Sequence, residues 1–360
     1  MGGIIGTKLD LKLLLSIGSL ILMGLLVLAS SGGDLVIKQL IWLIPAVFLL
    51  VGLPLLNIKA LLSYRWVFSS FYFLILILLV VTYFVAPVIG GAKSWITLGS
   101  FQIQPSEFMK AALIILLSSF FAVKHVAIGR LRIILSSFLY ALIPFMLILI
   151  QPDLGTALVI FGVWFGFLLV SGIRRKHLLI TLLVLTVVGF IGWNFVLEGY
   201  QKARIVGLFS PEADPLGINY STIQSKIAIG SGGIWGKGFG QGTQAHLGFL
   251  PAAHTDFIFS AFVEEWGLIG GALFLFAFGY LVYRTLVLGM ESGNNFGRFL
   301  SLGTALMLLI HFIINIGSAI GMLPVIGVGL PLVSYGGSNL LTTALLLGII
   351  QGVSDRKDRG

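Results

Sequence analysis

The chain has 360 residues, of which 58% are hydrophobic and 10% charged, and its formal net charge is +9. Soluble domains carry about 25% charged residues, so this composition excludes an ordinary soluble enzyme or binding module. The apolar runs approach the roughly 20 residues that a helix needs to cross a bilayer, and they lack the alternation of membrane barrel strands. We therefore predict an all-α integral membrane protein. The absence of cysteine excludes disulfides and thiolate chemistry.

About ten transmembrane helices are predicted in chain order. They cover residues 13–29, 35–53, 67–86, 108–123, 133–150, 154–170, 178–196, 257–282, 299–316 and 340–352. Together they form a single polytopic membrane domain over residues 1–360, with a large loop at 197–256 between the seventh and the eighth helix.

The distribution of Lys and Arg predicts how these helices are oriented. When the loops are assigned alternately to two sides, 15 of the 22 basic residues fall on the side of the amino terminus: Lys8, Lys12, Lys59, Arg65, Lys124, Arg130, Arg132, Arg174, Arg175, Lys176, Arg284, Arg298, Arg356, Lys357 and Arg359. Cytoplasmic loops carry this excess. Both termini are therefore expected in the cytoplasm, and the large loop is expected to be extracytoplasmic. No basic stretch with interleaved aromatic residues indicates nucleic-acid binding.

The large loop is too long for an ordinary connection and has apolar residues that a disordered tether would lack, so we expect it to be ordered. Residues 230–242 contain seven glycines in thirteen positions. Such a segment suits a phosphate cradle and a tight structural turn about equally well. The nearby Arg204, Lys226 and Lys237 favour an anion.

The loop ends in His254, Thr255 and Asp256, directly before an apolar helix. A carboxylate at such a boundary can serve as a general base, because partial burial raises its pKa while the helix dipole stabilises its charge. An ordinary helix cap by Thr255 or Asp256 is the simpler interpretation on chemistry alone. A metal site at His254 and Asp256 is weakly supported, since the neighbouring sequence supplies no third ligand.

Glu107 and Lys110 are three residues apart at the start of the fourth predicted helix, after Gln104-Pro105-Ser106. They would share a helix face, either as a structural ion pair or as contacts to a substrate head group. The motif Gln151-Pro152-Asp153 repeats the same theme before the sixth helix.

Five segments together resemble the SEDS family, which comprises RodA, FtsW and SpoVE. They are QPSE at 104–107, QPDLGTA at 151–157, the glycine-rich segment, HTDFIF at 254–259 and LPLVSYGGS at 330–338. The stretch from Asp214 through Tyr220 to the glycine-rich segment looks more like RodA than FtsW. One departure is Ala252-Ala253, where family members commonly have an acidic residue before the histidine.

The resemblance implies a peptidoglycan glycosyltransferase that polymerises lipid II into glycan strands for cell-wall elongation and cell shape, with inversion at the donor anomeric carbon. It implies a location in the bacterial cytoplasmic membrane, with a class B penicillin-binding protein and the elongation machinery as partners and undecaprenyl pyrophosphate as product. By carry-over, Asp256 is the catalytic base. From their charge we expect Arg204, Lys226 and Lys237 to neutralise the leaving pyrophosphate, and Glu107, Lys110, His254, Thr255 and Ser334 are further candidate substrate contacts. The sequence establishes no cofactor, and it leaves open whether the reaction uses a divalent cation such as Mg²⁺ or Mn²⁺.

Two other functions fit a ten-helix protein. One is a flippase that moves lipid II across the bilayer, and the other is a noncatalytic scaffold for the transpeptidase. A flippase would need charged side chains through the depth of the membrane, whereas the ionisable residues here cluster toward one face. The sequence therefore favours surface chemistry over transport.

Overall fold

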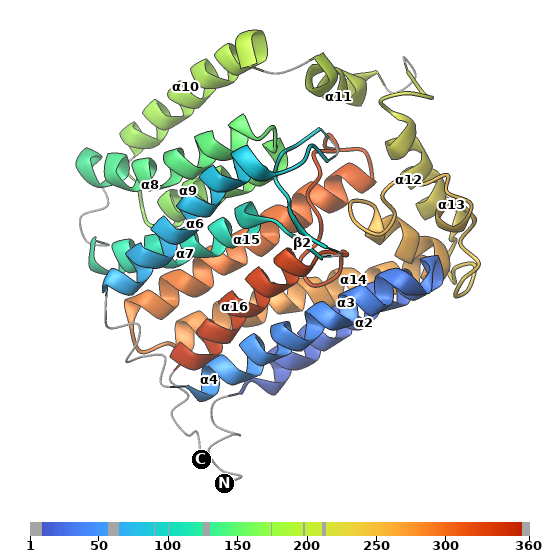
Figure 1. Cartoon of the computed structure of the whole chain (residues 1–360), viewed down its shortest axis with the longest axis horizontal. Helices are drawn as coiled ribbons and strands as arrows, with labels where there is room; N and C mark the ends of the chain where they lie inside the picture. Colours follow the sequence, from blue (N-terminus) through green and yellow to red (C-terminus); the bar gives the residue numbers. More distant parts are fainter. Residues whose placement is uncertain are drawn as a thin grey trace.

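The computed structural model describes residues 9–56, 65–89, 91–99, 101–124, 130–173, 175–196, 199–210 and 214–354 (Figure 1). Each predicted span contains a helix. The helices are α2 (Leu11–Ser31), α3 (Gly33–Val47), α6 (Arg65–Val85), α7 (Pro105–Lys124), α8 (Leu131–Ile150), α9 (Leu154–Val170), α10 (Arg175–Ile191), α14 (Ile258–Glu291), α15 (Asn295–Ala319) and α16 (Gly337–Val353). Within the described residues the strands are limited to a hairpin of β1 (Ile96–Leu98) and β2 (Phe101–Ile103), in which Ile96 pairs with Ile103. The all-α prediction is confirmed.

The second span is continuous although a proline interrupts its hydrogen bonds. Pro45 lies inside α3, and the helix continues through the π-helical η1 (Phe48–Gly52) into the short α4 (Leu53–Leu55). Proline lacks the amide hydrogen that would donate to the preceding turn, so a local change of helical pitch beside it is expected. The three pieces act as one membrane-spanning helix of 23 residues.

The eighth span is longer than predicted. Instead of ending at residue 282, α14 runs for 34 residues from Ile258 to Glu291, which corresponds to about 50 Å. It is interrupted at Gly267, whose φ of +66° is not helical. The part before Gly267 packs against the large loop. The extra residues lie at the other end of the helix, where Arg284 binds Asp10.

The described part of the large loop is folded, as predicted. It contains the helices α11 (Gly199–Phe209), α12 (Tyr220–Ser231) and α13 (Thr243–His246), and it follows η3 (Gly192–Val196) at the end of the seventh predicted span. Figure 1 shows α12 and α13 beside the start of α14, whereas α10 and α11 lie at the edge of the bundle.

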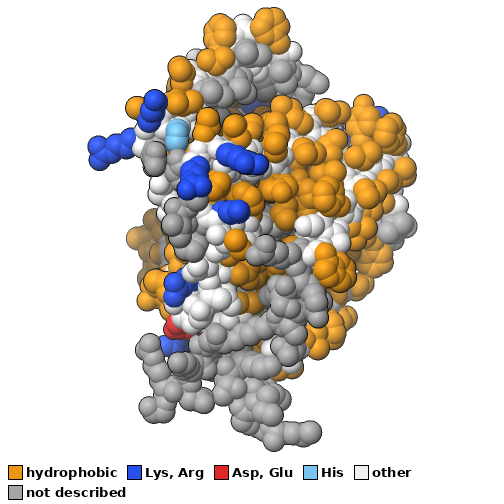
Figure 2. Space-filling model, turned by 90° about the vertical axis from the view of Figure 1, so that its left-hand side faces the viewer, with side chains coloured by type: hydrophobic (Ala, Val, Ile, Leu, Met, Phe, Trp, Pro, Cys, Tyr) orange, Lys and Arg blue, Asp and Glu red, His pale blue; other side chains and the backbone are white. Residues whose placement is uncertain are grey.

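One end of the bundle is basic. The Arg284 Nε atom donates to Asp10 Oδ2 over 3.1 Å, and the Asp10 amide donates to Gln351 Oε1 over 3.0 Å. These bonds join the start of α2 to the ends of α14 and α16. Successive helix ends alternate between the two sides of the bundle, and several exposed basic side chains fall on the same side as Asp10. They are Lys124, Arg130, Arg132, Arg175, Lys176 and Arg298. Figure 2 shows Lys and Arg side chains gathered along one edge of a largely hydrophobic face. Lys8, Lys59, Arg174, Arg356, Lys357 and Arg359 lie outside the described residues.

The bundle exposes large apolar side chains along its outer helices. Ile44 of α3, Phe84 of α6 and Phe276 of α14 are 73%, 77% and 72% exposed. Seven of the described helices are long and apolar enough to cross a membrane, and α9 and α16 are shorter apolar helices. Such continuous apolar exposure is stable in lipid but not in water. The chain is therefore a multi-pass membrane protein.

Replacing Asp10 with alanine is expected to destabilise the protein by about 3 kcal/mol, since it removes a buried partner of Arg284. It also removes the cap of α2, where Asp10 Oδ1 accepts from the Leu13 amide. The shift would be measured as a lower melting temperature in detergent. Asp34, an exposed acid in the first turn of α3, is the matched control. An equal loss in Asp10→Ala and Asp34→Ala would contradict the assignment.

Candidate active site

A cavity of about 560 Å³ lies at the end of the bundle opposite the Asp10 and Arg284 pair. Here α7, α9, α14 and α16 begin and α15 ends, so several helix termini meet around it. Its polar lining residues are Ser94, Gln104, Glu107, Asp153, Thr156, Gln201, Arg204, Thr255, Asp256, Ser334, Tyr335, Ser338 and Asn339.

The turn that carries Asp256 is fixed by three consecutive hydrogen bonds to its carbonyls. The Tyr335 amide donates to His254 O over 2.9 Å, and Ser334 Oγ donates to Thr255 O over 2.7 Å. Asn315 Nδ2 donates to Asp256 O over 2.9 Å and also contacts Val328 O at 2.9 Å. The segment is thus tied both to α15 and to the loop before α16.

The carboxylate of Asp256 is left available to the cavity. Among the described residues no hydrogen bond reaches it, and the cap of α14 is Phe257, which makes no side-chain bond. The helix-cap interpretation of Thr255 and Asp256 is therefore wrong, because Phe257 is the cap residue of α14 and no described side chain accepts from the amides of its first turn. Burial raises the pKa of Asp256 to about 6, while the positive charge of Arg204 acts to lower it. A carboxylate that titrates near neutrality can accept a proton.

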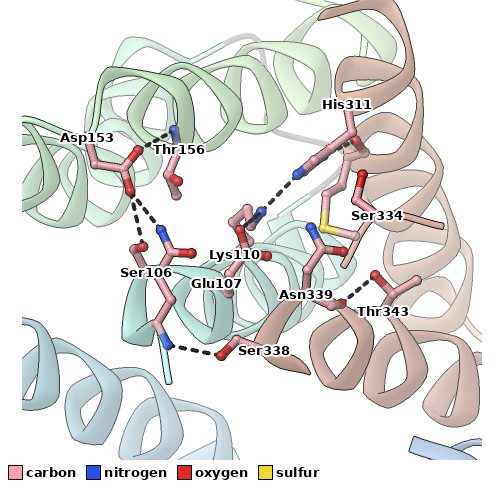
Figure 3. A network of polar contacts seen from close by, with 12 residues as sticks. Ser106, Glu107, Lys110, Asp153, Thr156, His311, Ser334, Ser338, Asn339 and Thr343 are labelled. Carbon is pink, nitrogen blue, oxygen red and sulfur yellow. Dashed lines mark hydrogen bonds and ion pairs between the residues drawn. The ribbon is translucent and has the colours of Figure 1, made fainter. Parts of the chain in front are cut away.

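Glu107 and Lys110 form a buried ion pair, with 2.7 Å between Lys110 Nζ and Glu107 Oε1 (Figure 3). Glu107 also lines the cavity, whereas Lys110 lies behind it. Lys110 Nζ is 2.8 Å from His311 Nε2, and His311 Nδ1 is 2.8 Å from Met307 O. A carbonyl only accepts, so Nδ1 carries the hydrogen and Nε2 accepts from the ammonium. His311 thus holds Lys110 as a neutral imidazole.

The two Gln-Pro motifs meet at the cavity wall. Gln104 Nε2 donates to Asp153 Oδ2 over 3.0 Å, and the Thr156 amide donates to Asp153 Oδ1 over 3.0 Å. The Gln104 amide donates to Ser338 Oγ over 2.9 Å. Asp153 is therefore an acceptor that caps α9 and joins it to α7, as Figure 3 shows.

The glycine-rich segment packs against α14 and does not line the cavity. A Cβ at Gly236 would lie 2.1 Å from the carbonyl oxygen of Glu265, and one at Gly267 would lie 2.3 Å from that of Ile234. The glycines thus permit close backbone contact, which supports the structural-turn alternative. Lys237 Nζ is 2.6 Å from Glu264 Oε1 and 2.8 Å from Thr243 Oγ1. The placement of Lys237 at the substrate is not supported, because its ammonium neutralises a buried glutamate.

The other candidates divide into three groups. Arg204, Thr255 and Ser334 line the cavity together with Glu107 and Asp256. Ser334 accepts from the Leu330 amide over 2.8 Å while donating to Thr255 O, so it positions the Asp256 turn. Lys226 lies in a smaller neighbouring pocket that also includes Arg204. His254 is half-buried, and burial lowers the pKa of its imidazole.

Sequence reasoning missed His311, Asn315 and Asn339. His311 and Asn315 are one helical turn apart on α15. His311 contacts the Lys110 ammonium, and Asn315 donates to the Asp256 carbonyl. Asn339 is on the cavity wall. The available signal was a polar side chain inside an apolar helix, which usually has a function in a membrane protein.

Comparison with known proteins agrees with the sequence resemblance. The family model FTSW/RODA/SPOVE, described as a cell cycle protein family, matches residues 8–359. The peptidoglycan glycosyltransferase MrdB of Escherichia coli is 39% identical over 284 residues, covering 78% of this chain and 76% of that protein. The peptidoglycan glycosyltransferase RodA of Treponema pallidum is 30% identical and covers 97% and 98% of the two chains.

Two solved structures share the fold over nearly their full length. A chain from a study of structural coordination of polymerization and crosslinking by a peptidoglycan synthase complex has a TM-score of 0.81 at 30% identity, with 96% of this chain and 97% of that chain covered. The rod shape determining protein RodA of Thermus thermophilus has a TM-score of 0.70 at 28% identity, with coverage of 97% and 98%. This chain belongs to the FtsW, RodA and SpoVE family, the SEDS proteins.

Proposed function

We propose that this protein is a peptidoglycan glycosyltransferase that polymerises lipid II into glycan strands for cell-wall elongation and cell shape. The observation that carries the proposal is the carboxylate of Asp256, which lines the cavity while the turn that carries it is held by three hydrogen bonds. The names of the relatives support the reaction class, since MrdB and RodA are both peptidoglycan glycosyltransferases.

The cavity is assigned to the outer face of the cytoplasmic membrane. Most of the exposed Lys and Arg side chains in the described part of the chain lie at the opposite helix ends, and an excess of basic residues marks the cytoplasmic side. The two termini belong to that basic side. The site would then receive the head groups of lipid-linked sugars at the outer surface.

The reaction needs one displacement. The acceptor lipid II presents its sugar 4-hydroxyl, whose oxygen attacks the anomeric carbon of the growing chain. The new carbon–oxygen bond forms as the bond to the pyrophosphate oxygen breaks, and the electron pair leaves with undecaprenyl pyrophosphate. Asp256 takes the hydroxyl proton. An α-linked donor and a β-linked product require inversion, so no second carboxylate nucleophile is needed.

Basic side chains supply the charge that the leaving group needs. Arg204 lines the cavity and acts electrostatically on Asp256, so it lies close to the reacting centre. Stabilisation of developing charge by such a group is often a large catalytic contribution. Within the described residues no group of three or more His, Cys, Asp or Glu side chains could hold a metal ion.

The packing on the basic side of the cavity favours a polymerase over a flippase. Phe121 of α7 stacks on Phe167 of α9 with ring centroids 5.6 Å apart and contacts Phe299 of α15 at 6.1 Å. Phe121 and Phe167 are fully buried. This apolar plug lies about 16 Å along α7 from Lys110. A pyrophosphate head group would have to cross it without a polar partner.

A class B penicillin-binding protein is proposed as the partner. The support is the similarity to a chain of a peptidoglycan synthase complex that coordinates polymerization and crosslinking. The scaffold alternative would use the same partner but would not need an available carboxylate in the cavity.

Asp256→Asn is expected to reduce polymerisation at least 1000-fold, because the amide cannot accept the hydroxyl proton at neutral pH. Polymer formed from labelled lipid II by the purified protein with its partner would be resolved on gels. The melting temperature in detergent serves as the folding control, since the three carbonyl bonds do not involve the carboxylate. Polymerisation within a factor of three of the wild type would remove Asp256 from the role of base.

The polymerisation rate is expected to fall about tenfold between pH 7.5 and pH 5, since a base with a pKa of about 6 is then mostly protonated. The sign follows from the requirement for the carboxylate: activity is full above the pKa and is lost as the pH falls through it. Arg204→Gln should move this acid limb to higher pH, because Arg204 lowers the pKa of Asp256. A flat profile in a folded protein would contradict the assignment.

A further inference from the structure

The glycine-rich segment at 230–242 does not line the cavity, yet it carries large apolar side chains on its surface. Ile234 is 59% exposed and Trp235 is 82% exposed. Among the described residues the indole N–H of Trp235 has no acceptor. Water in contact with such side chains costs free energy. The exposure therefore indicates that something other than water covers these two residues.

The segment is held rigidly against the break in α14. Four backbone hydrogen bonds of 2.9–3.3 Å join residues 233–238 to residues 264–269. In one of them the Ile269 amide donates to Ile234 O. This pairing is possible because the backbone of α14 is not helical at Gly267. The segment thus lies along the side of α14 and does not project away from it.

Contacts between α2 and α14 give the depth of the segment in the membrane. The Asp10 and Arg284 pair joins the two helices at the basic end, and Ser30 contacts the side chain of Glu265 at the other end. These contacts are about 30 Å apart along α2 and about 29 Å apart along α14, which matches the roughly 30 Å thickness of the hydrocarbon core. Figure 1 shows the end of α2 beside α13. Glu265 and the segment bonded to it therefore lie at the boundary between hydrocarbon and head groups.

The exposed pair continues the lipid-facing surface of α14. Ile269, Leu273 and Phe276 are exposed, and their spacing places them on one face of the helix. Since Ile234 is bonded to Ile269, the segment extends this apolar face toward the head groups. Ile234 and Trp235 are thus at the edge of a surface that already contacts lipid.

The segment can enter the membrane interface without burying an unpaired charge. Lys237 is the one charged residue in 230–242. Its ammonium lies 2.6 Å from Oε1 of Glu264, which is fully buried, so the charge is neutralised within the protein. The backbone bonds to α14 satisfy amides and carbonyls that lipid could not.

We infer that residues 233–236 form a membrane-interface anchor, in which Ile234 and Trp235 insert into the leaflet on the cavity side. The ring of Trp235 contacts acyl chains while its N–H reaches the head groups, as is typical of tryptophan at membrane boundaries. In the proposed orientation this is the outer leaflet. The inference does not depend on the proposed enzymatic activity.

The anchor has a consequence for the cavity. Helix α12 leads directly into the segment, and Ser225 of α12 contacts Ser260 Oγ at 2.6 Å and donates to Ala319 O over 2.6 Å. Ser260 lies on α14, four residues after Asp256. Buried bonds therefore connect the anchor to the start of α14, and the anchor holds the Asp256 turn at the level of the head groups.

A partner protein is the competing occupant of this surface. A stable protein interface buries about 800 Å² on each side, which is far more than two side chains provide. Unpaired charges that would orient a partner are also missing from residues 230–242, since Lys237 is bound to Glu264. Lipid is therefore the favoured occupant.

The first experiment measures the depth of a spin label. The chain contains no cysteine, so a single introduced cysteine is labelled uniquely. The variants are Trp235→Cys, Phe276→Cys as the lipid reference and Asp34→Cys as the water reference, since Asp34 is an exposed acid next to the end of α2. Each labelled protein is placed without a partner in nanodiscs of phosphatidylethanolamine and phosphatidylglycerol. Collision rates with oxygen and with a water-soluble nickel complex are compared.

The ratio of oxygen to nickel collisions at Trp235→Cys is expected to be at least threefold higher than at Asp34→Cys, in the direction of Phe276→Cys. A ratio equal to that of Asp34→Cys would overturn the anchor. A ratio that rises only after the penicillin-binding protein is added would also overturn it, because the surface would then belong to a protein partner. Melting temperatures confirm that each variant is folded.

The second experiment tests whether the Trp235 side chain holds the segment in lipid. The label is placed at Ile234→Cys, and position 235 is changed as well. Trp235→Asp is expected to raise the nickel collision rate at least twofold, because a carboxylate is costly in lipid, and the milder Trp235→Ser should shift it in the same direction. Trp235→Phe should leave it unchanged. Equal collision rates in all four proteins would overturn the role of Trp235.

Discussion

The whole site depends on the pairing of three successive carbonyls, those of His254, Thr255 and Asp256. A carbonyl buried without a partner costs free energy, and the cost is higher near lipid. Here each carbonyl accepts a bond from a different donor, on α15 or on the loop before α16. These bonds hold the turn through its carbonyls, and the cap position of α14 belongs to Phe257 and not to Asp256. Its carboxylate can face the cavity while its position is fixed.

The other acidic side chains near the site differ from Asp256 because each has a hydrogen-bond or ion-pair partner. Asp153 accepts from Gln104 and from the Thr156 amide, and Glu107 is paired with Lys110. Glu264 is fully buried and accepts from Lys237 and from the Gln244 amide. Each of these carboxylates stabilises a junction between elements. Asp256 differs because burial raises its pKa without a compensating hydrogen bond from the described residues, and this combination suits a base rather than a structural acceptor.

The spans and the ordered loop could be predicted because each depends on local sequence, whereas the role of Asp256 as base comes from the family resemblance. Apolar runs of sufficient length determine the helices, and Asp256 stands where a polar segment meets one of them. The role of Asn315 could not be predicted, since its acceptors Asp256 and Val328 are 59 and 13 residues away in the chain. The pairing of Lys237 could not be predicted for the same reason, since its partner Glu264 is 27 residues away in the chain. Sequence proximity to other basic residues does not show which cation already has a buried counter-ion.

Helix α15 connects the two charged parts of the site. His311 and Asn315 are separated by one helical turn, so they project from the same face toward Lys110 and toward the Asp256 carbonyl. A shift of α15 along its axis would lengthen both contacts together. The ion pair of Glu107 and Lys110 and the position of the base are therefore coupled through one rigid element.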